Sequence, residues 1–249
     1  MTVGSNKFFG QIRMTIKHKF FVGLAFLLFS FGTTPEQEND LRFLNFVTDP
    51  SAIKFYWKDD RGEIFRSIQN LKSFVETKNQ DLKFAMNGGM YMKDNSPQGL
   101  YIENSETLAP LDTLSGKGNF YLKPNGVFYL TKDNRAVVCE TSRFTNNGQV
   151  NFATQSGPML LIDGEIHSAF MKGSKNLNIR NGVGILPDNK VIFAVSKEEV
   201  NFYDFAEYFK SMNCKYALYL DGFVSRTYLP EENWKQLDGN FGVIMGVSK

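Results

Sequence analysis

Two segments of the chain repeat apolar residues every three to four positions, the spacing of one face of an α-helix. In residues 61–78 the repeat falls on Ile64, Ile68, Leu71 and Val75. In residues 200–213 it falls on Phe202, Phe205, Ala206, Phe209 and Met212. Asn201 stands directly before this second repeat, where an N-cap residue is expected. We expect one helix in each segment.

Most other apolar stretches are short and bounded by Gly, Asn or Pro, which is typical of β-strands. They are residues 83–86, 99–102, 126–130, 136–139, 158–162, 182–186, 191–195, 217–220 and 242–246. The sequence "LPDNK" at 186–190 separates two of them and predicts a hairpin turn. About nine strands and two helices predict an α+β fold: a single sheet-rich domain with a mixed β-sheet core and a few flanking helices.

The N-terminus has the order of a secretory signal peptide. Basic residues at 17–19 precede an apolar run at 20–31, and the small residues Ser30 and Gly32 lie at the end of this run. The run is shorter than the roughly 20 apolar residues that span a membrane. We therefore expect a signal peptide over residues 1–33, a domain over residues 34–249, export to the periplasm or the cell exterior, and no stable membrane span. An uncleaved anchor is the alternative.

Composition narrows the function classes. Hydrophobic residues make up 42% of the 249 positions, enough for one sizeable core. The 28 basic and 26 acidic residues nearly balance, so nothing indicates a nucleic-acid partner. Cys139 and Cys214 are too few for a disulfide framework, and either one bridge or two free thiols fits. Nothing in the sequence indicates an oligomeric state.

The sequence predicts neither a cofactor nor a metal site, because it has no cluster of His or Cys. An ion held by oxygen ligands at Asp221 stays an alternative. His167 is the single histidine outside the signal segment, and we interpret it as a structural residue. Without a Gly-x-Ser-x-Gly motif, a serine hydrolase is disfavoured.

Polar residues follow or precede several of the predicted strands. Asn87 ends one strand, and Gly88 and Gly89 then let the backbone bend and a ligand approach closely. The alternative is a simple hairpin turn, which Asn-Gly favours. Before strand 158–162 stand Gln155, Ser156 and Gly157, for which the alternative is ordinary loop chemistry.

Two further strand ends carry charged residues. Arg180, followed by Asn181, leads into strand 182–186; its guanidinium suits phosphate or carboxylate, although a surface ion pair is the commoner role. Asp221 ends the apolar run "YALYL", Gly222 allows the chain to turn, and Ser225 follows. An ordinary turn is the alternative interpretation of this stretch.

Together these stretches resemble the phosphodiester glycosidase family, to which the lysosomal uncovering enzyme belongs, and in particular its bacterial branch of exported proteins. The resemblance runs from about Lys83 to the C-terminus. It rests on "NGGMY", "PQGLY", "GNFYLKPNGVF", "ATQSGPMLL", "RNGVGI" and "YLDGFVS", in the order of the family. Phe223 stands where the family often has a second glycine, and we expect it to narrow that loop.

The resemblance implies an exported hydrolase that cleaves a sugar-1-phosphodiester, with a carbohydrate or sugar-phosphate substrate. The departing phosphate is already an anion, so the reaction depends less on a general acid than ordinary glycoside hydrolysis does. It needs a carboxylate near the anomeric carbon, and a cation and neutral donors for the phosphate.

We assign the catalytic roles to Asp221, Arg180 and Asn87. The substrate-binding candidates are Gly88, Gly89, Gln155, Ser156, Gly157, Asn181, Gly222 and Ser225. For a second carboxylate the options are Asp94 and Asp204, the latter fitting the polar face of a helix. The alternatives in function are a non-catalytic glycan- or sugar-phosphate-binding module and a structural protein of the cell envelope.

Overall fold

The computed structural model describes residues 1, 10, 40–222 and 224–249. The apolar run of the predicted signal peptide, at 20–31, and Phe223 lie outside the described residues. The signal peptide therefore stays a prediction. Within the described part of the chain, no helix combines the length and the apolar character that crossing a membrane requires.

Sixteen strands among the described residues form three sheets, which we call sheets A, B and C. Sheet A has the order β1 (Phe43–Thr48), β12 (Val191–Ser196), β11 (Asn181–Ile185), β13 (Ala217–Tyr219), β9 (Met159–Ile162) and β10 (Glu165–Ile166). Sheet B has the order β15 (Trp234–Lys235), β14 (Thr227–Leu229), β3 (Leu82–Asn87), β16 (Ile244–Ser248) and β2 (Ile53–Tyr56). Sheet C has the order β5 (Glu106–Ala109), β4 (Tyr101–Glu103), β8 (Val150–Ser156), β6 (Gly126–Thr131) and β7 (Ala136–Glu140).

The prediction of one mixed sheet is wrong, because every pairing between the described strands is antiparallel. Tight turns explain part of this arrangement, since two neighbouring strands joined by a short turn must run in opposite directions. The predicted turn at 186–190 joins β11 to β12, and Asp163 and Gly164 join β9 to β10 with φ of 52° and 83°. The sheet-rich character is confirmed, with mostly β structure and few helices.

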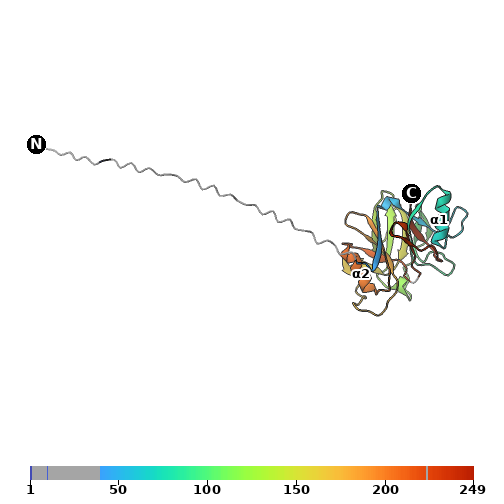
Figure 1. The fold of residues 1–249 in the computed structure, drawn as a ribbon. Coiled ribbons are helices and arrows are strands. Elements are labelled where there is room, and N and C mark those ends of the chain that lie inside the picture. Colours follow the sequence, from blue (N-terminus) through green and yellow to red (C-terminus); the bar gives the residue numbers. More distant parts are fainter. Residues whose placement is uncertain (2–9, 11–39, 223) are drawn as a thin grey trace. The chain divides into compact units, whose positions relative to one another are not determined.

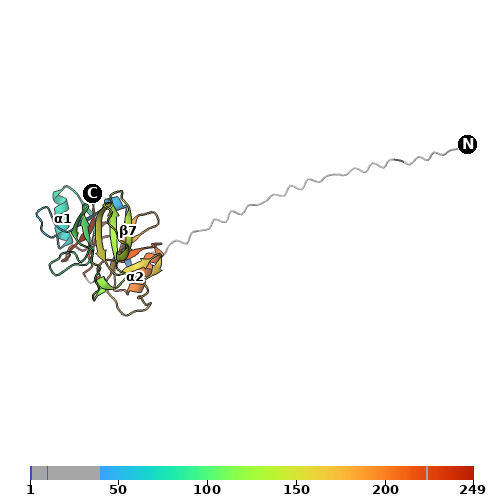
Figure 2. The same cartoon turned by 180° about the vertical axis from the view of Figure 1, so that it is seen from behind.

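The two α-helices lie where the apolar repeats predict them. α1 (Ile68–Thr77) begins later than expected: Ser67 caps it by accepting a hydrogen bond from Asn70 N–H, while Ile64 forms a β-bridge with Lys58. α2 (Phe202–Ser211) has the predicted cap, in which Asn201 Oδ1 accepts from Asp204 N–H at 2.9 Å. α1 packs on β3, and α2 packs on β9 and β10. Both views place the helices at opposite ends of the folded body (Figures 1 and 2).

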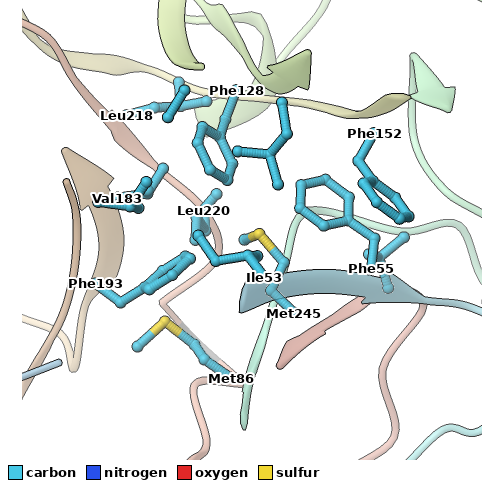
Figure 3. Packing of buried hydrophobic residues seen from close by; sticks show 14 of the residues in the cluster. Ile53, Phe55, Met86, Phe128, Phe152, Val183, Phe193, Leu218, Leu220 and Met245 are labelled. Carbon is cyan, nitrogen blue, oxygen red and sulfur yellow. The ribbon is translucent and has the colours of Figure 1, made fainter. Parts of the chain in front are cut away.

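A single cluster of buried side chains joins the three sheets (Figure 3). Phe193 comes from sheet A, Met86 from sheet B and Phe128 from sheet C, and all three are at most 1% exposed. The ring of Phe128 lies 6.1 Å from that of Phe193, edge to face, which is a favourable aromatic arrangement. Leu220, the residue before Asp221, belongs to this cluster. The hydrophobic core therefore ends directly beneath the predicted catalytic carboxylate.

Both cysteines are free thiols, Cys139 half-buried and Cys214 buried. Burial raises the pKa of the Cys139 thiol to about 11 and that of Cys214 to about 12. Of the two alternatives that the sequence leaves open, the structure has the free thiols.

Candidate active site

Ends of strands from all three sheets meet at one place. Asn87 is the last residue of β3 in sheet B, and Ser156 is the last residue of β8 in sheet C. Asn181 begins β11 in sheet A, and Asp221 follows β13 of the same sheet by two residues. Because β11 and β13 are antiparallel neighbours, the start of one lies beside the end of the other. The polar residues at these strand ends thus come together.

Three side chains hold the backbone of Asp221. Asn181 Oδ1 accepts from the Asp221 N–H at 2.8 Å, while Asn87 Nδ2 and Ser225 Oγ donate to the Asp221 carbonyl at 3.1 and 2.7 Å. Asn181 Nδ2 also donates to Asn87 Oδ1 at 3.0 Å, which ties β11 to β3. Both asparagines are fully buried, and Asp221 is half-buried. Buried amides that lose a partner are costly, so this network fixes the position of Asp221.

The residues on either side of Asp221 are anchored in the same way. Ser156 Oγ donates to the Leu220 carbonyl at 2.6 Å, and the Gly222 N–H donates to the Tyr219 hydroxyl at 2.6 Å. A Cβ atom at position 222 would collide with that hydroxyl and with the Ile179 carbonyl. Only glycine fits this position, and it allows the close packing that holds the turn.

Two tyrosines lie close enough to Asp221 to feel its charge. Burial raises the pKa of Tyr219 to about 12, with the Asp221 carboxylate adding to the effect and Arg180 opposing it. Burial, followed by the charge of Asp221, also raises the pKa of Tyr91. Both hydroxyls are therefore protonated at neutral pH and can act as hydrogen-bond donors.

Neither tyrosine is among the residues assigned from the sequence, although signals for both are present. Tyr219 precedes Asp221 by two positions and begins the "YLDGFVS" motif. Tyr91 is the last residue of the "NGGMY" motif, of which only the first three residues were assigned.

Arg180 is buried, with 1% of its surface exposed. Its Nε donates to the Val200 carbonyl and its Nη2 to the Asn176 carbonyl, both at 2.8 Å. Its guanidinium lies 3.6 Å from the centre of the Phe202 ring, a cation–π contact. Burial lowers the pKa of Arg180, and the neighbouring Tyr219 opposes that shift. The alternative of a surface ion pair is wrong for this residue.

The backbone at the two glycines after β3 passes very close to the neighbouring strands β8 and β16. A Cβ atom at Gly89 would lie 2.6 Å from Thr154 Oγ1 of β8, and one at Gly88 would lie 2.9 Å from the Met245 side chain of β16. The hairpin alternative for Asn87–Gly88 is wrong, because β3 pairs with β14 and β16, whereas the next strand, β4, belongs to sheet C. These glycines carry the chain from one sheet to another.

Gln155 and Gly157 do not join the cluster at Asp221. Gln155 is 1% exposed, and its Oε1 accepts from the N–H groups of Leu100 and Asp112 at 3.0 and 2.9 Å. A Cβ atom at Gly157 would lie 2.6 Å from Asn125 Cβ. Both residues pack against the outer loops of sheet C.

The other candidates have local roles. Asp94 Oδ1 accepts from the Ser96 N–H at 3.0 Å and so closes a turn, and Asp204 lies in the first turn of α2. His167 is buried, stacks on Phe170 with ring centres 4.7 Å apart, and accepts from the Ala169 N–H through Nδ1 at 3.1 Å. Among residues 40–222 and 224–249, no group of three or more His, Cys, Asp or Glu side chains could hold a metal ion.

Comparisons with known proteins point in one direction. The model of the phosphodiester glycosidase family matches residues 80–242. The protein YigE of Escherichia coli (strain K12) is 35% identical over 225 residues, which is 88% of each chain.

Two solved structures share the fold. One is the catalytic domain of zebrafish N-acetylglucosamine-1-phosphodiester alpha-N-acetylglucosaminidase, auto-inhibited by its pro-peptide, with a TM-score of 0.55, 15% identity and 84% of each chain covered. The other is a Burkholderia pseudomallei K96243 protein described as exported, with a TM-score of 0.55 and 10% identity over 82% of this chain and 73% of that one.

Proposed function

This chain belongs to the phosphodiester glycosidase family, and we propose that it hydrolyses a glycosyl phosphodiester to a free sugar and a phosphomonoester. One observation carries the proposal: a half-buried carboxylate, Asp221, is held where three sheets meet, by buried side chains that bond to its backbone. An aspartate whose backbone is fixed before the substrate binds loses little free energy to reorganisation during the reaction. The similar zebrafish enzyme is named for the same type of bond.

In the proposed reaction, a water oxygen bonds to the anomeric carbon while the bond from that carbon to the phosphate oxygen breaks. The electron pair stays with the phosphate, which leaves as an anion and needs no proton. Asp221 takes the proton of the water, and its charge stabilises the positive character that develops at the anomeric carbon.

The remaining assignments support this carboxylate. In the proposal, Asn87 and Asn181 position Asp221. Gly88 and Gly89 let the substrate approach the backbone. Arg180, which lies next to the ring of Tyr219, supplies the positive charge that attracts the phosphate. Tyr219 connects this cation to the turn at Gly222. We propose that the Arg180 guanidinium contacts the phosphate, which the substitution Arg180→Lys tests.

The test is a panel of synthetic sugar-1-phosphodiesters incubated with the purified protein, with free sugar as the readout. Aryl glycosides of the same sugars, which lack the phosphate, are the matched control. We expect sugar release from at least one phosphodiester and much less from its aryl control. Binding of the panel without any turnover would overturn the proposal in favour of a glycan- or sugar-phosphate-binding module.

We also propose export to the periplasm or the cell exterior. The order of basic, apolar and small residues at 17–32 supports it, together with the similarity to a Burkholderia protein described as exported. Protein recovered from the extracytoplasmic fraction should begin near residue 33 when its N-terminus is sequenced. A terminus at Met1 or Met14 in the membrane fraction would contradict export by cleavage.

A further inference from the structure

The connection between β5 and β6, residues 110–125, is unusually long. Most connections in compact domains have about 4–6 residues, and long loops with little secondary structure of their own are usually functional. This loop contains one short 3-10 turn, Asn119–Tyr121. It lies in the part of the chain that the proposed hydrolysis at Asp221 does not use.

Hydrogen bonds fix the loop although it has little regular structure. The Asp112 carboxylate accepts from the Tyr121 hydroxyl at 2.9 Å and from the Leu114 N–H at 2.8 Å. Lys123 Nζ donates to the Thr113 carbonyl at 3.2 Å. From beneath, Gln155 bonds to both backbone groups of Asp112, at 2.9 Å to its N–H and at 2.6 Å to its carbonyl. A loop held in this way offers a surface that is already shaped for a ligand.

Two cavities lie along this loop. One, of about 430 Å³, is lined in part by Thr113, Lys123, Glu140, Thr141 and Ser142. The other, of about 420 Å³, is lined in part by Pro97, Gly99, Asp112, Thr113 and Leu114. Because Thr113 lines both, they form neighbouring parts of one groove, which we call the loop groove. Each is within the size range of small-ligand sites, about 300–1,000 Å³.

The loop groove is separate from the site at Asp221. Gln155 and Ser156 are consecutive residues of β8, so their side chains point to opposite faces of sheet C. Ser156 bonds to Leu220, beside Asp221, whereas Gln155 bonds to Asp112 and to Thr141 Oγ1 in the walls of the groove. The two sites therefore lie on either side of the same strand.

The chemistry of the groove selects the class of ligand. The charges along the groove cancel: Glu140 pairs with Arg143 at 3.0 Å, and Lys123 and Asp112 carry opposite charges, so the groove has no net positive charge that would select a phosphate. Hydroxyl, carboxylate and ammonium groups together can donate to and accept from the hydroxyls of a sugar. Pro110, Leu111 and Leu114 add an apolar wall to the second cavity, which suits the apolar face of a sugar ring.

We propose that the loop groove is a carbohydrate-binding site that holds a neutral sugar ring, independent of hydrolysis at Asp221. Exposed Ser142 and Thr113 can be replaced without disturbing the core. Ser142→Trp should fill the larger cavity. The matched control is Thr145→Trp, an exposed position three residues further along that lines neither cavity.

The experiment is an NMR titration of the full-length protein with chitotriose and with maltotriose, each to about 10 mM, enough to detect a Kd of about 1 mM. Inorganic phosphate serves as the anionic comparison. We expect one of the sugars to shift the amide signals of Thr113, Thr141 and Ser142, and phosphate to leave them in place. Ser142→Trp should weaken binding at least tenfold, and Thr145→Trp should not.

The proposal is overturned if neither sugar shifts these signals, if phosphate alone does, or if Ser142→Trp binds like the unchanged protein. Asp221→Asn should bind the sugar normally. Sugar binding in the loop groove and the proposed hydrolysis can therefore fail independently, because hydrolysis is measured by sugar release and not by these amide signals.

Discussion

Asp221 is held through its backbone. Asn181 bonds to its N–H, and Asn87 and Ser225 bond to its carbonyl. These bonds do not depend on the charge of the carboxylate, so a change at the carboxylate leaves them intact. Activity and stability can therefore be separated at this residue.

Asp221→Asn should fold with a nearly unchanged Tm and lose at least about 10²-fold in rate on glycosyl phosphodiesters, the usual scale for a lost acid–base group. Asparagine matches the shape of aspartate but lacks its charge. The matched control is Asp94→Asn, an exposed carboxylate that closes a turn, for which we expect normal activity. Near-normal turnover by well-folded Asp221→Asn would show that Asp221 is an ordinary turn residue without a catalytic role.

Arg180→Lys tests the role of the buried cation. Lysine has no planar fork with which to reach both the Val200 and Asn176 carbonyls, so we expect a loss of about 1–3 kcal/mol in the free energy of unfolding. If the guanidinium of Arg180 also binds the phosphate, activity on phosphodiesters should fall further than activity on uncharged aryl glycosides. Equal losses on both substrates would make Arg180 a structural residue alone.

The sequence indicates which polar residues lie at strand ends, because a polar side chain directly after an apolar run is visible in the pattern. It does not indicate which of two consecutive residues faces the site. Gln155 and Ser156 illustrate this: the sequence predicts substrate binding for both, but only Ser156 reaches the backbone beside Asp221. The strand that decides their directions, β8, was itself missed from the sequence.

At the scale of elements, strands with continuous apolar residues could be predicted and the others could not. β8 ends in Thr154, Gln155 and Ser156, a polar run typical of a loop, yet all three are buried because their side chains find partners or packing inside the fold. β14 and β15 have only three and two residues. β14 is stabilised as a strand by pairing with β3, and β15 by pairing with β14. The direction of pairing was also not predictable, since an apolar run looks the same in parallel and antiparallel sheets.

The connection from β10 to β11 gives a pH-dependent contribution to stability. Burial lowers the pKa of His167 below its ordinary value of 6.5. The unfolded chain therefore binds the proton more tightly, and stability is full above pH 6.5 and falls as the pH drops below it toward the folded pKa.

We expect the Tm to decrease between about pH 7 and pH 5, because protonation ends the hydrogen bond from the Ala169 N–H to Nδ1. His167→Asn, which keeps an acceptor for that N–H but does not titrate, should have a smaller decrease across the same range. An equal decrease in both proteins, measured by calorimetry, would assign the pH dependence to other groups.

At the scale of the whole molecule, the three sheets share one central core, and each sheet also contributes to a further buried cluster of its own. Phe193, Met86 and Phe128 come from different sheets and belong to the same buried cluster (Figure 3). Since no sheet has this core to itself, we expect residues 40–249 to unfold in a single cooperative transition.

Phe128→Ala should lower the free energy of unfolding by about 3–5 kcal/mol, the usual cost of removing a buried aromatic ring. The transition should stay single when urea unfolding is followed both by circular dichroism and by the fluorescence of Trp57 and Trp234. Val137→Ala, at a half-buried position of β7, is the control and should cost much less. Two separate transitions would show that the sheets do not share their stability.

The place of β16 in sheet B has a consequence for how a nascent chain acquires its structure. β2 pairs only with β16 among the described strands, and β3 pairs with β14 and β16. Neither β2 nor β3 can therefore form its sheet pairings before residues 227–248 have been synthesised. When the ribosome has synthesised the chain only as far as residue 220, Asn87 and Asn181 are present, but the backbone of Asp221 to which they bond is not. Sheet B and the candidate active site are therefore completed together, once residues 221–248 have been synthesised.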